Sequence, residues 1–442
     1  MAAATRRLPL QRHPWFDAWA YPKGCALHDL AAEIAARLDR DEEARGTRAR
    51  RRRNHVEHER EVSICIVVAN LSRLVLDPGE TARLAVVLGK TRLMAKRYRS
   101  PASGRLRTAL LDQLEHLELV HIARSKRRGE ASSIAPTASF AALCRGHRIT
   151  LADFGRVCRE ETIVARPRRD TNAGSPPALL DYPETGETEG MRAVVVALNA
   201  HIAQADIAFL GDHLGPVNAH ERHQRRLFNG PPDDPLQGNG RLYGGFWQNL
   251  KRERRRGLRI NGEETVVADY SSMFVRLAYA RLGVTPPAGD LYVVPGLEKN
   301  REAVKVLTST LFFDQRQRSS WPKDEGLVVP SGWPLPKARA AIFCRHPVLR
   351  SSFGRGLGHE LMRLESDIML AVLDQLREKG VVALNLHDGL IVAAGDAMAA
   401  QTMMLEIGQQ RTGAHLPVVI KHSSGAASVS PASPSSTPSF HP

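Results

Sequence analysis

The sequence predicts an α+β protein with more than one domain, and three observations lead to this fold class. Residues 105–119 carry leucines at helical spacing, as expected for a mostly helical first part of the chain. Between about residues 175 and 422, short apolar strands alternate with helical segments. The chain has 442 residues, 43% of them hydrophobic, which is enough for two or three domains that each bury a core.

Charge is the second global feature of the sequence. Lys and Arg number 62 against 47 Asp and Glu, which gives a formal net charge of +15. Such an excess favours a polyanionic partner, because a basic side chain that contacts a phosphate releases a condensed counterion. A generic basic protein with solvated charges is the alternative. The basic residues are clustered, which favours the nucleic acid.

The cysteines and the hydropathy bear on the compartment. No CxxC pair or Cys/His cluster is present, so we expect neither a zinc site nor a disulfide framework, and a reducing cytoplasm fits. No secretory signal and no apolar run long enough to span a bilayer are seen, so no membrane partner is expected. The five cysteines are Cys25, Cys65, Cys144, Cys158 and Cys344.

Composition divides the chain into four segments. Residues 1–54 are expected to form a basic, largely flexible arm, with a short helix at about 27–38. Residues 55–170 are expected to form a compact, mostly helical domain, and residues 171–422 a domain of strands and helices. Residues 423–442 consist largely of Ser, Pro and Ala, and we expect them to be disordered.

The order of elements in the second segment resembles a winged helix-turn-helix. A helix at 105–119 is followed by a strand at 120–123, a basic turn at 124–130 and a returning strand at 131–135. A winged helix would present its helix to a DNA groove and its turn to phosphates. A structural helix and hairpin with a solvated loop is the alternative. The expected DNA-binding residues are Arg105, Arg107, Lys126, Arg127 and Arg128.

Three blocks in the third segment carry side chains suited to chemistry. The first is 264–276, ETVVADYSSMFVR, in which an apolar strand ends at Asp269 and a helix follows. A carboxylate at the end of a buried strand is well placed to bind a metal ion. An ordinary helix N-cap is the alternative interpretation of the same residue.

The second block is 300–314, in which four side chains are spaced by four residues. On an α-helix they form one stripe of two cations, a small residue and an aromatic. The cations suit the phosphates of a nucleoside triphosphate and the aromatic suits its base. A helix with a solvated basic face is the alternative. The four residues are Arg301, Lys305, Ser309 and Phe313.

The third block is 381–392, VVALNLHDGLIV, in which two apolar strands flank His387, Asp388 and Gly389. Asp-Gly is a strong hairpin signal, and it places Asp388 at the tip between two buried strands. A carboxylate there is costly unless it is paired or bound to a metal. A plain Asp-Gly turn is the alternative.

The three blocks together have the layout of two-metal phosphoryl transfer. Two aspartates at strand ends would hold two Mg²⁺ ions about 3.5–4 Å apart, since carboxylates are ligands that Mg²⁺ prefers. One ion would activate an attacking 3′-hydroxyl and the other would hold the triphosphate. The predicted metal ligands are Asp269 and Asp388, with Lys305 as a proton donor to the leaving pyrophosphate.

Residues 240–395 resemble the palm and fingers of the family A DNA polymerases and the related phage-type single-subunit RNA polymerases. ADYSSMFVR is similar to their first motif, the spacing of Arg301 and Lys305 to their fingers helix, and NLHDG to their third motif. The resemblance implies a right-hand fold whose palm is an antiparallel sheet and whose fingers are helical. It also implies that DNA, as primer and template, and nucleoside triphosphates are the partners.

The resemblance also assigns further site residues. Upstream, GRL at 240–242 and QNL at 248–250 resemble the signatures that contact the primer-template, and LESDIM at 364–369 resembles the helix before the third motif. It implies that the primer-template residues are Arg241, Gln248, Asn249, Arg276 and His387, and that Tyr270 and Phe274 join Arg301, Lys305, Ser309 and Phe313 at the nucleotide.

The predicted function is therefore template-directed nucleotidyl transfer, with a DNA polymerase as the leading interpretation. Phe274 stands where the DNA enzymes of the family carry a glutamate that screens out ribose, and a bulky ring there could block ribose sterically. A DNA-binding replication initiator or regulator with a degenerate polymerase-like domain is one alternative. An RNA polymerase or primase is another.

Overall fold

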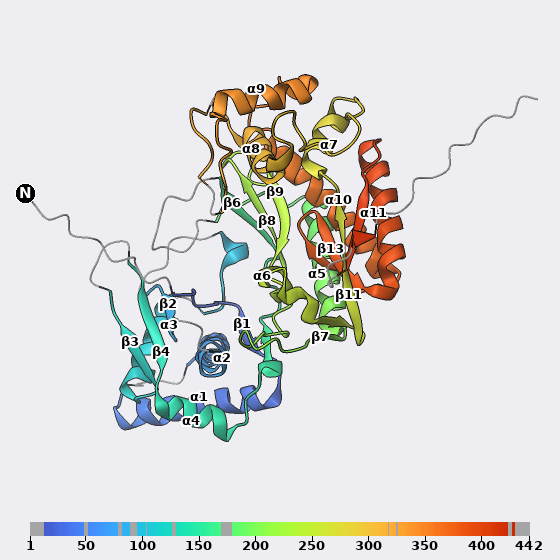
Figure 1. Ribbon diagram of the computed structural model, residues 1–442. Helices are drawn as coiled ribbons and strands as arrows, with labels where there is room; N and C mark the ends of the chain where they lie inside the picture. Colours follow the sequence, from blue (N-terminus) through green and yellow to red (C-terminus); the bar gives the residue numbers. More distant parts are fainter. Residues whose placement is uncertain are drawn as a thin grey trace, which may run out of the picture. The chain divides into compact units, whose positions relative to one another are not determined.

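The computed structural model describes residues 13–47, 52–77, 82–88, 95–102, 104–125, 130–168, 179–316, 318–323, 326–422 and 427–428. Its contacts divide the chain into two compact units (Figure 1). The first comprises residues 1–161 and 166–181, and the second comprises residues 162–165 and 182–442. The expected Ser/Pro tail lies almost entirely outside the described residues.

The N-terminal unit is built from helices around two small antiparallel sheets. One sheet pairs β1 with β5, and the other has the order β2-β4-β3. The strands are β1 (Ala20–Pro22), β2 (Leu84–Val86), β3 (Val120–Ala123), β4 (Ser132–Pro136) and β5 (Phe154–Arg156). The helices are α1 (Cys25–Ala44), α2 (Asn54–Leu76), α3 (Gly104–His116) and α4 (Ala138–Gly146), with short 3₁₀ turns at Lys96–Tyr98 and Leu151–Asp153.

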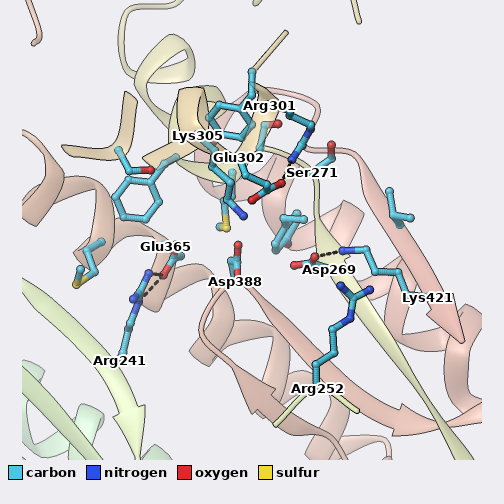
Figure 2. A pocket seen from close by; sticks show the side chains of 18 of the residues that line it. Arg241, Arg252, Asp269, Ser271, Arg301, Glu302, Lys305, Glu365, Asp388 and Lys421 are labelled. Carbon is cyan, nitrogen blue, oxygen red and sulfur yellow. Dashed lines mark hydrogen bonds and ion pairs between the residues drawn. The ribbon is translucent and has the colours of Figure 1, made fainter. Parts of the chain in front are cut away.

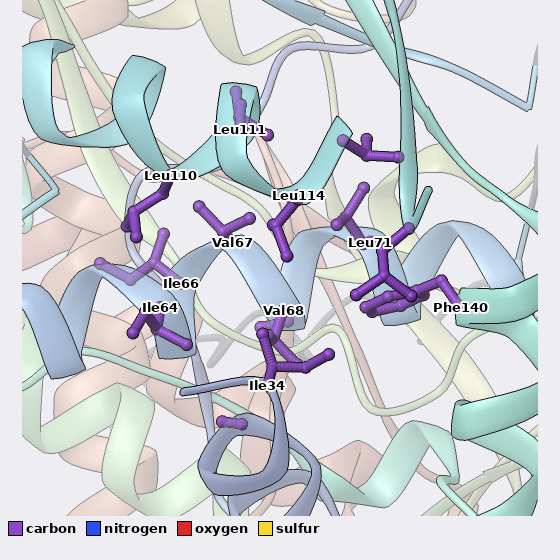
Figure 3. Close-up of a cluster of buried hydrophobic side chains, with 14 of the residues drawn as sticks. Ile34, Ile64, Ile66, Val67, Val68, Leu71, Leu110, Leu111, Leu114 and Phe140 are labelled. Atoms are coloured by element: carbon purple, nitrogen blue, oxygen red, sulfur yellow. The ribbon is translucent and has the colours of Figure 1, made fainter. Parts of the chain in front are cut away.

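Helix α2 runs through the middle of this unit. Every residue from 66 to 72 is buried, so the helix is covered on all sides. Leu110 and Leu114 of α3, Ile34 of α1 and Phe140 of α4 surround it (Figure 3). The polar side chain of Asn70 is buried with its hydrogen bonds made, since its amide donates to the carbonyl oxygens of Asp17 and Ile66.

The expected flexible arm is folded over part of its length. Helix α1 is longer than the expected 27–38 helix, and its apolar side chains Leu27, Leu30, Ile34 and Leu38 are fully buried. They fall on one face because they recur every three or four residues, and that face packs into the core around α2. The expectation of a largely flexible arm is therefore wrong for residues 25–44.

Helix α3 and strands β3 and β4 lie where the sequence predicts a helix and hairpin, but one expected DNA contact is wrong. Arg107 is 6% exposed, donates to the carbonyl oxygen of Val87 and stacks its guanidinium over Phe16. Arg105, two residues earlier, is exposed. Lys126, Arg127 and Arg128 lie outside the described residues, so the winged helix as a DNA-binding module stays a prediction.

The C-terminal unit contains a large antiparallel sheet and a smaller sheet. The large sheet has the order β12-β13-β11-β10-β7, with β14 paired to β11 and β15 paired to β14. The smaller sheet has the order β6-β8-β9, with β8 and β9 antiparallel. The strands are β6 (Ile163–Pro167), β7 (Ile207–Phe209), β8 (Arg225–Gly230), β9 (Asn239–Tyr243), β10 (Leu258–Ile260), β11 (Glu263–Tyr270), β12 (Leu384–Leu386), β13 (Gly389–Ala393), β14 (Val418–His422) and β15 (Ala427–Ser428).

Helices cover these sheets, and α10 is central among them, since it contacts α5, α7, α8, α11 and β9 (Figure 1). The helices are α5 (Gly186–Gln204), α6 (Phe246–Asn249), α7 (Met273–Arg281), α8 (Arg301–Phe313), α9 (Leu335–Arg345), α10 (Gly358–Glu378) and α11 (Ala397–Thr412). Short 3₁₀ turns lie at Arg254–Gly257, Glu298–Asn300, Pro347–Leu349 and Ala394–Asp396.

Strand β11 has two different faces, as alternation along a strand requires. Val266, Ala268 and Tyr270 are buried, and the Tyr270 hydroxyl donates to the carbonyl oxygen of Met404 in α11. On the other face Val267 packs on a second apolar cluster that contains Trp247, and Asp269 follows it. This unit, like the first, mixes helices with antiparallel strands and so confirms the α+β class, whereas the right-hand palm remains a prediction.

Among the helices of the described residues, none combines the length and the apolar composition that a membrane crossing needs.

Candidate active site

A cavity of about 740 Å³ opens beside the end of β11. Its wall combines side chains from the large sheet, α7, α8 and α10 (Figure 2). Five basic side chains line it: Arg241, Arg252, Arg301, Lys305 and Lys421. Four carboxylates do so as well: Asp269, Glu302, Glu365 and Asp388. Charges of both signs are thus gathered on one concave surface, as in sites that bind charged ligands.

Asp269 occupies the point where β11 turns into α7. The turn is fixed by hydrogen bonds to two carbonyl oxygens: the amide of Ser271 donates to Pro417, and the side-chain Nε of Arg276 donates to Ser271 at 2.9 Å. Ser272 has a left-handed backbone (φ 54°) and precedes the first residue of α7. The Asp269 side chain is 26% exposed and forms an ion pair with Lys421.

Asp388 lies next to Asp269 although 118 residues separate them in sequence. Asp269 pairs with Gly389 across β11 and β13, and the amide of Tyr270 donates to the carbonyl oxygen of Asp388 at 3.1 Å. Both carboxylates point into the cavity (Figure 2). Desolvation and then the charge of Asp269 raise the pKa of Asp388, which is the expected effect of burying two like charges together.

Gly389 is what allows the two strands to meet at this point. A Cβ atom at this position would lie 2.6 Å from the carbonyl oxygen of Ala268 and 3.2 Å from Oδ1 of Asp269. Any side chain would therefore push the hairpin away from β11. Gly389 therefore allows Asp388 to approach Asp269 closely, in addition to forming part of the Asp-Gly turn.

The stripe predicted on α8 faces the cavity. Arg301, Lys305, Ser309 and Phe313 all line it, while Val304, Leu307 and Leu311 on the other side of the helix are buried. The Nη1 of Arg301 donates to Glu302 at 2.9 Å, its Nε pairs with Asp290, and its guanidinium lies 5.3 Å from the ring centre of Tyr292. Lys305 is exposed to the cavity and lies between Arg301 and the two aspartates (Figure 2).

An aromatic wall closes one end of the site. The rings of Phe274 and Phe313 lie 5.8 Å apart at 37°, and His359 meets Phe313 edge-on at 5.2 Å. Gly358 accommodates Phe313, because a Cβ there would lie 2.6 Å from the ring. Phe274 and Phe313 thus form an apolar surface beside the charged part of the cavity, and a planar ring could stack on either of the two tilted rings.

Glu365 is a site residue that the sequence reasoning missed. It is fully buried in α10, and its Oε1 accepts from Arg241 at 2.6 Å. Its Oε2 has no hydrogen-bond partner among the described residues. Desolvation outweighs the attraction of Arg241 and raises the pKa of Glu365 to about 7. Two signals for it were present in the sequence: its position in LESDIM at 364–369, and a glutamate on the apolar face of an otherwise amphipathic helix.

Lys421 and Arg252 were also missed as cavity residues. Lys421 lies on β14, where alternation places it on the same face as Val267, its partner on β11. The sequence showed a lysine within an apolar strand, VVIKH, but not which strand would pair with it. Arg252 belongs to the basic run KRERRR at 251–256. The sequence pattern does not show which of these side chains face the cavity and which face solvent.

Several residues that were predicted to contact the nucleotide or the primer-template make other contacts in the structure. Tyr270 borders the cavity, but its side chain is 2% exposed and its hydroxyl is bonded to Met404, so it anchors the sheet to α11. Arg276 supports the turn after Asp269. Gln248 ties its own loop together, accepting from the amide of Gly244 and donating to the carbonyl oxygen of Leu242. Asn249 is exposed and does not line the cavity.

Arg241 lies on the side of Asp388 away from Lys421 (Figure 2). Together with His387 it lines a second, small cavity next to α10. The His387 backbone is left-handed (φ 35°), and its ring lies 5.6 Å from that of Tyr243. Desolvation, with the nearby charges of Arg241 and Arg255, lowers the pKa of His387 to about 4, so its imidazole is neutral at physiological pH.

The donor set fits Mg²⁺ better than a softer metal. Among the described residues, no three side chains of His, Cys, Asp or Glu gather as a metal site. Asp269 and Asp388 offer carboxylate oxygens alone, and Mg²⁺ is commonly held by one or two carboxylates with water and substrate phosphates completing its shell. The like charges of the two aspartates also favour a divalent cation between them.

Comparison with known protein families and with curated proteins finds no match for this chain.

Proposed function

We propose that the C-terminal unit is a template-directed nucleotidyltransferase, most simply a DNA polymerase, that extends a nucleic-acid 3′-hydroxyl with nucleoside triphosphates. The observation that carries this proposal is the meeting of Asp269 and Asp388 in one cavity, opposite the Arg301–Lys305 stripe of α8. The order of the motifs, which resembles family A DNA polymerases and phage-type RNA polymerases, supports the same reaction.

The chain's own residues take distinct roles in this reaction. Two Mg²⁺ ions bound by Asp269 and Asp388 would supply the Lewis acidity for attack and departure. Arg301 and Lys305 bind the triphosphate, and Phe313 stacks on the base. The 3′-hydroxyl loses its proton to solvent as its oxygen bonds to the α-phosphorus, and the bond to the bridging oxygen breaks, its electron pair leaving with pyrophosphate. Lys305 can donate a proton to that leaving group.

Arg241 and His387 are the proposed contacts to the primer end. They lie on the Asp388 side of the cavity, and the pairing with Glu365 holds the Arg241 guanidinium in a fixed direction. Arg241 also lies 5.9 Å from the ring centre of Phe274, so primer and nucleotide contacts are adjacent. A neutral His387 could donate or accept a hydrogen bond without adding charge.

Deoxynucleotides are the proposed substrates, because Phe274 stands in the first motif where the DNA polymerases of the resemblance carry a glutamate that screens out ribose, and its bulky ring would block a 2′-hydroxyl sterically. Competitive incorporation of deoxy- and ribonucleotides on one primed template tests this. Preferential use of deoxynucleotides supports the steric argument, and equal use of both contradicts it.

Primer extension with Mg²⁺ tests the enzymatic proposal. Asp388→Asn should lower extension by about 1000-fold or more, because it removes a ligand whose metal supplies several kcal/mol of stabilisation to the transition state. Primer-template affinity, measured by fluorescence anisotropy, should change little. Wild-type protein that binds DNA but extends no template would instead favour an initiator or regulator. Synthesis on unprimed single strands would favour an RNA polymerase or primase.

A further inference from the structure

Lys421 stands in the cavity on the opposite side of the carboxylates from Arg241. It reaches Asp269 from β14, and its side chain is 40% exposed, so part of its ammonium surface faces the open cavity. An ion pair that exposed contributes little to stability. Its position in the cavity therefore calls for an explanation other than holding the sheet together.

Arg252 lies on the same side as Lys421. Its exposed guanidinium points toward Asp269 and Lys421, whereas Arg301 and Lys305 approach the carboxylates from α8 (Figure 2). The carboxylate pair thus has basic groups on two walls, one formed by α8 and the other by β14 and the loop before β10. Only the helical pair was expected from the sequence.

The geometry of the proposed reaction predicts which ligand Lys421 and Arg252 bind. In phosphoryl transfer the attacking and leaving oxygens lie roughly in line on opposite sides of the phosphorus. The primer end is proposed at Arg241 and His387, so in the proposed reaction the pyrophosphate leaves on the side of the cavity away from Arg241, where Lys421 and Arg252 face Lys305 across the two aspartates (Figure 2). Pyrophosphate carries several negative charges, and two cations at that exit match it.

We propose that Lys421, with Arg252, forms a sheet-side binding site for the distal phosphates of the nucleotide and for the pyrophosphate product. This inference rests on the proposed function for the direction of the reaction. Lys421 can serve Asp269 and a phosphate together, because an ammonium has three N–H donors. The site differs from the α8 stripe in its position and in the elements that form it. Neither Lys421 nor Arg252 belongs to the motifs of the resemblance.

Direct binding of two probes tests the site without requiring turnover. The probes are inorganic pyrophosphate and a non-hydrolysable deoxynucleoside triphosphate, each titrated calorimetrically with Mg²⁺ into the full chain. Lys421→Met keeps the length of the side chain and removes its charge, so both dissociation constants should rise by about tenfold or more, as for loss of a charge-assisted hydrogen bond. Lys421→Arg should recover most of the affinity.

Lys379→Met is the matched control, since Lys379 is an exposed lysine at the end of α10 that does not line the cavity. Both methionine variants should unfold at the wild-type temperature. If Lys421→Met binds both probes as tightly as Lys379→Met does, the proposed site is wrong. It is equally wrong if wild-type protein binds neither probe.

Failure of the two proposals can be told apart. Wild-type protein that binds pyrophosphate in a Lys421-dependent manner but extends no primer supports the phosphate site and contradicts the polymerase. Protein that extends primers normally, with pyrophosphate affinity independent of Lys421, supports the polymerase and contradicts the site.

Discussion

Two groups of charged side chains, one in each unit, differ in how their charges are arranged. In the N-terminal unit, two arginines are matched by carboxylates: Arg156 donates to both Asp17 and Glu160, and Arg60 pairs with Asp39 and Glu57. In the C-terminal unit, Asp269 and Asp388 point into one cavity, and Glu365 is buried with one oxygen unpartnered among the described residues. Matched charges hold a fold together, whereas charges brought together against repulsion indicate a place for a ligand.

The largest effect on stability is expected from breaking a matched group. Arg156→Met removes a guanidinium that is 20% exposed and takes one cation away from Asp17 and from Glu160, whose side chain is 4% exposed. The free energy of unfolding should fall by about 3 kcal/mol, as for removal of one partner of a buried ion pair. Urea denaturation followed by circular dichroism measures it.

Asp388→Asn, in the C-terminal unit, is the substitution to compare with Arg156→Met. Because it removes one of two like charges, it should leave the free energy of unfolding unchanged or raise it, although it removes activity. A loss of stability in Asp388→Asn equal to that in Arg156→Met would contradict the contrast between the units.

The comparison of the two units can also be tested through the pH dependence of the free energy of unfolding, which Glu365 is expected to affect. Its pKa is raised from 4.5 to about 7 in the folded protein, so the folded state keeps a proton that the unfolded chain has lost. The stabilisation is full below about pH 4.5 and is lost as the pH rises to about 7, up to about 3 kcal/mol in all. Relative to Glu365→Gln, which does not titrate, wild-type protein should lose stability between pH 5 and about 8.

Parallel stability curves for wild type and Glu365→Gln, measured by urea denaturation at each pH, would show that Arg241 keeps Glu365 ionised throughout. The other titrating groups are common to both proteins, so the difference between the curves reports on this carboxyl alone.

The smallest effect is expected at the aromatic wall. Gly358→Ala places a methyl group against the Phe313 ring, which must tilt to avoid a 2.6 Å contact. Because Phe313 is proposed to stack on the base, the KM for nucleotide should rise by up to about tenfold, with little change in kcat. Steady-state extension measures both, and an unchanged KM together with an unchanged melting temperature would mean that Phe313 does not contact the nucleotide.

Local patterns in the sequence predicted the parts of the site that depend on one element. The four-residue spacing on α8 placed Arg301 and Lys305 on one face, and Asp-Gly predicted the hairpin that carries Asp388. These predictions needed only helix periodicity and turn chemistry.

Features that depend on partners distant in sequence could not be predicted in this way. Lys421 reaches the cavity because β14 pairs with β11, and Glu365 because α10 packs beside β9. Arg107 was expected to face a DNA groove from the helix of a winged helix, yet the carbonyl oxygen of Val87 and the ring of Phe16 provide it with partners inside the unit. A basic composition over residues 1–54 likewise obscured the apolar face of α1.

The left-handed backbones of Ser272 and His387 have a consequence for how this protein could be improved. Ser272 lies three residues after Asp269, and His387 directly precedes Asp388. In a residue other than glycine, a left-handed backbone lowers the stability of the folded state by about 1 kcal/mol or more. Selection for heat resistance would therefore favour glycine at both positions. The same change would loosen the two turns that aim the carboxylates, so variants that gain in heat resistance there should lose in turnover.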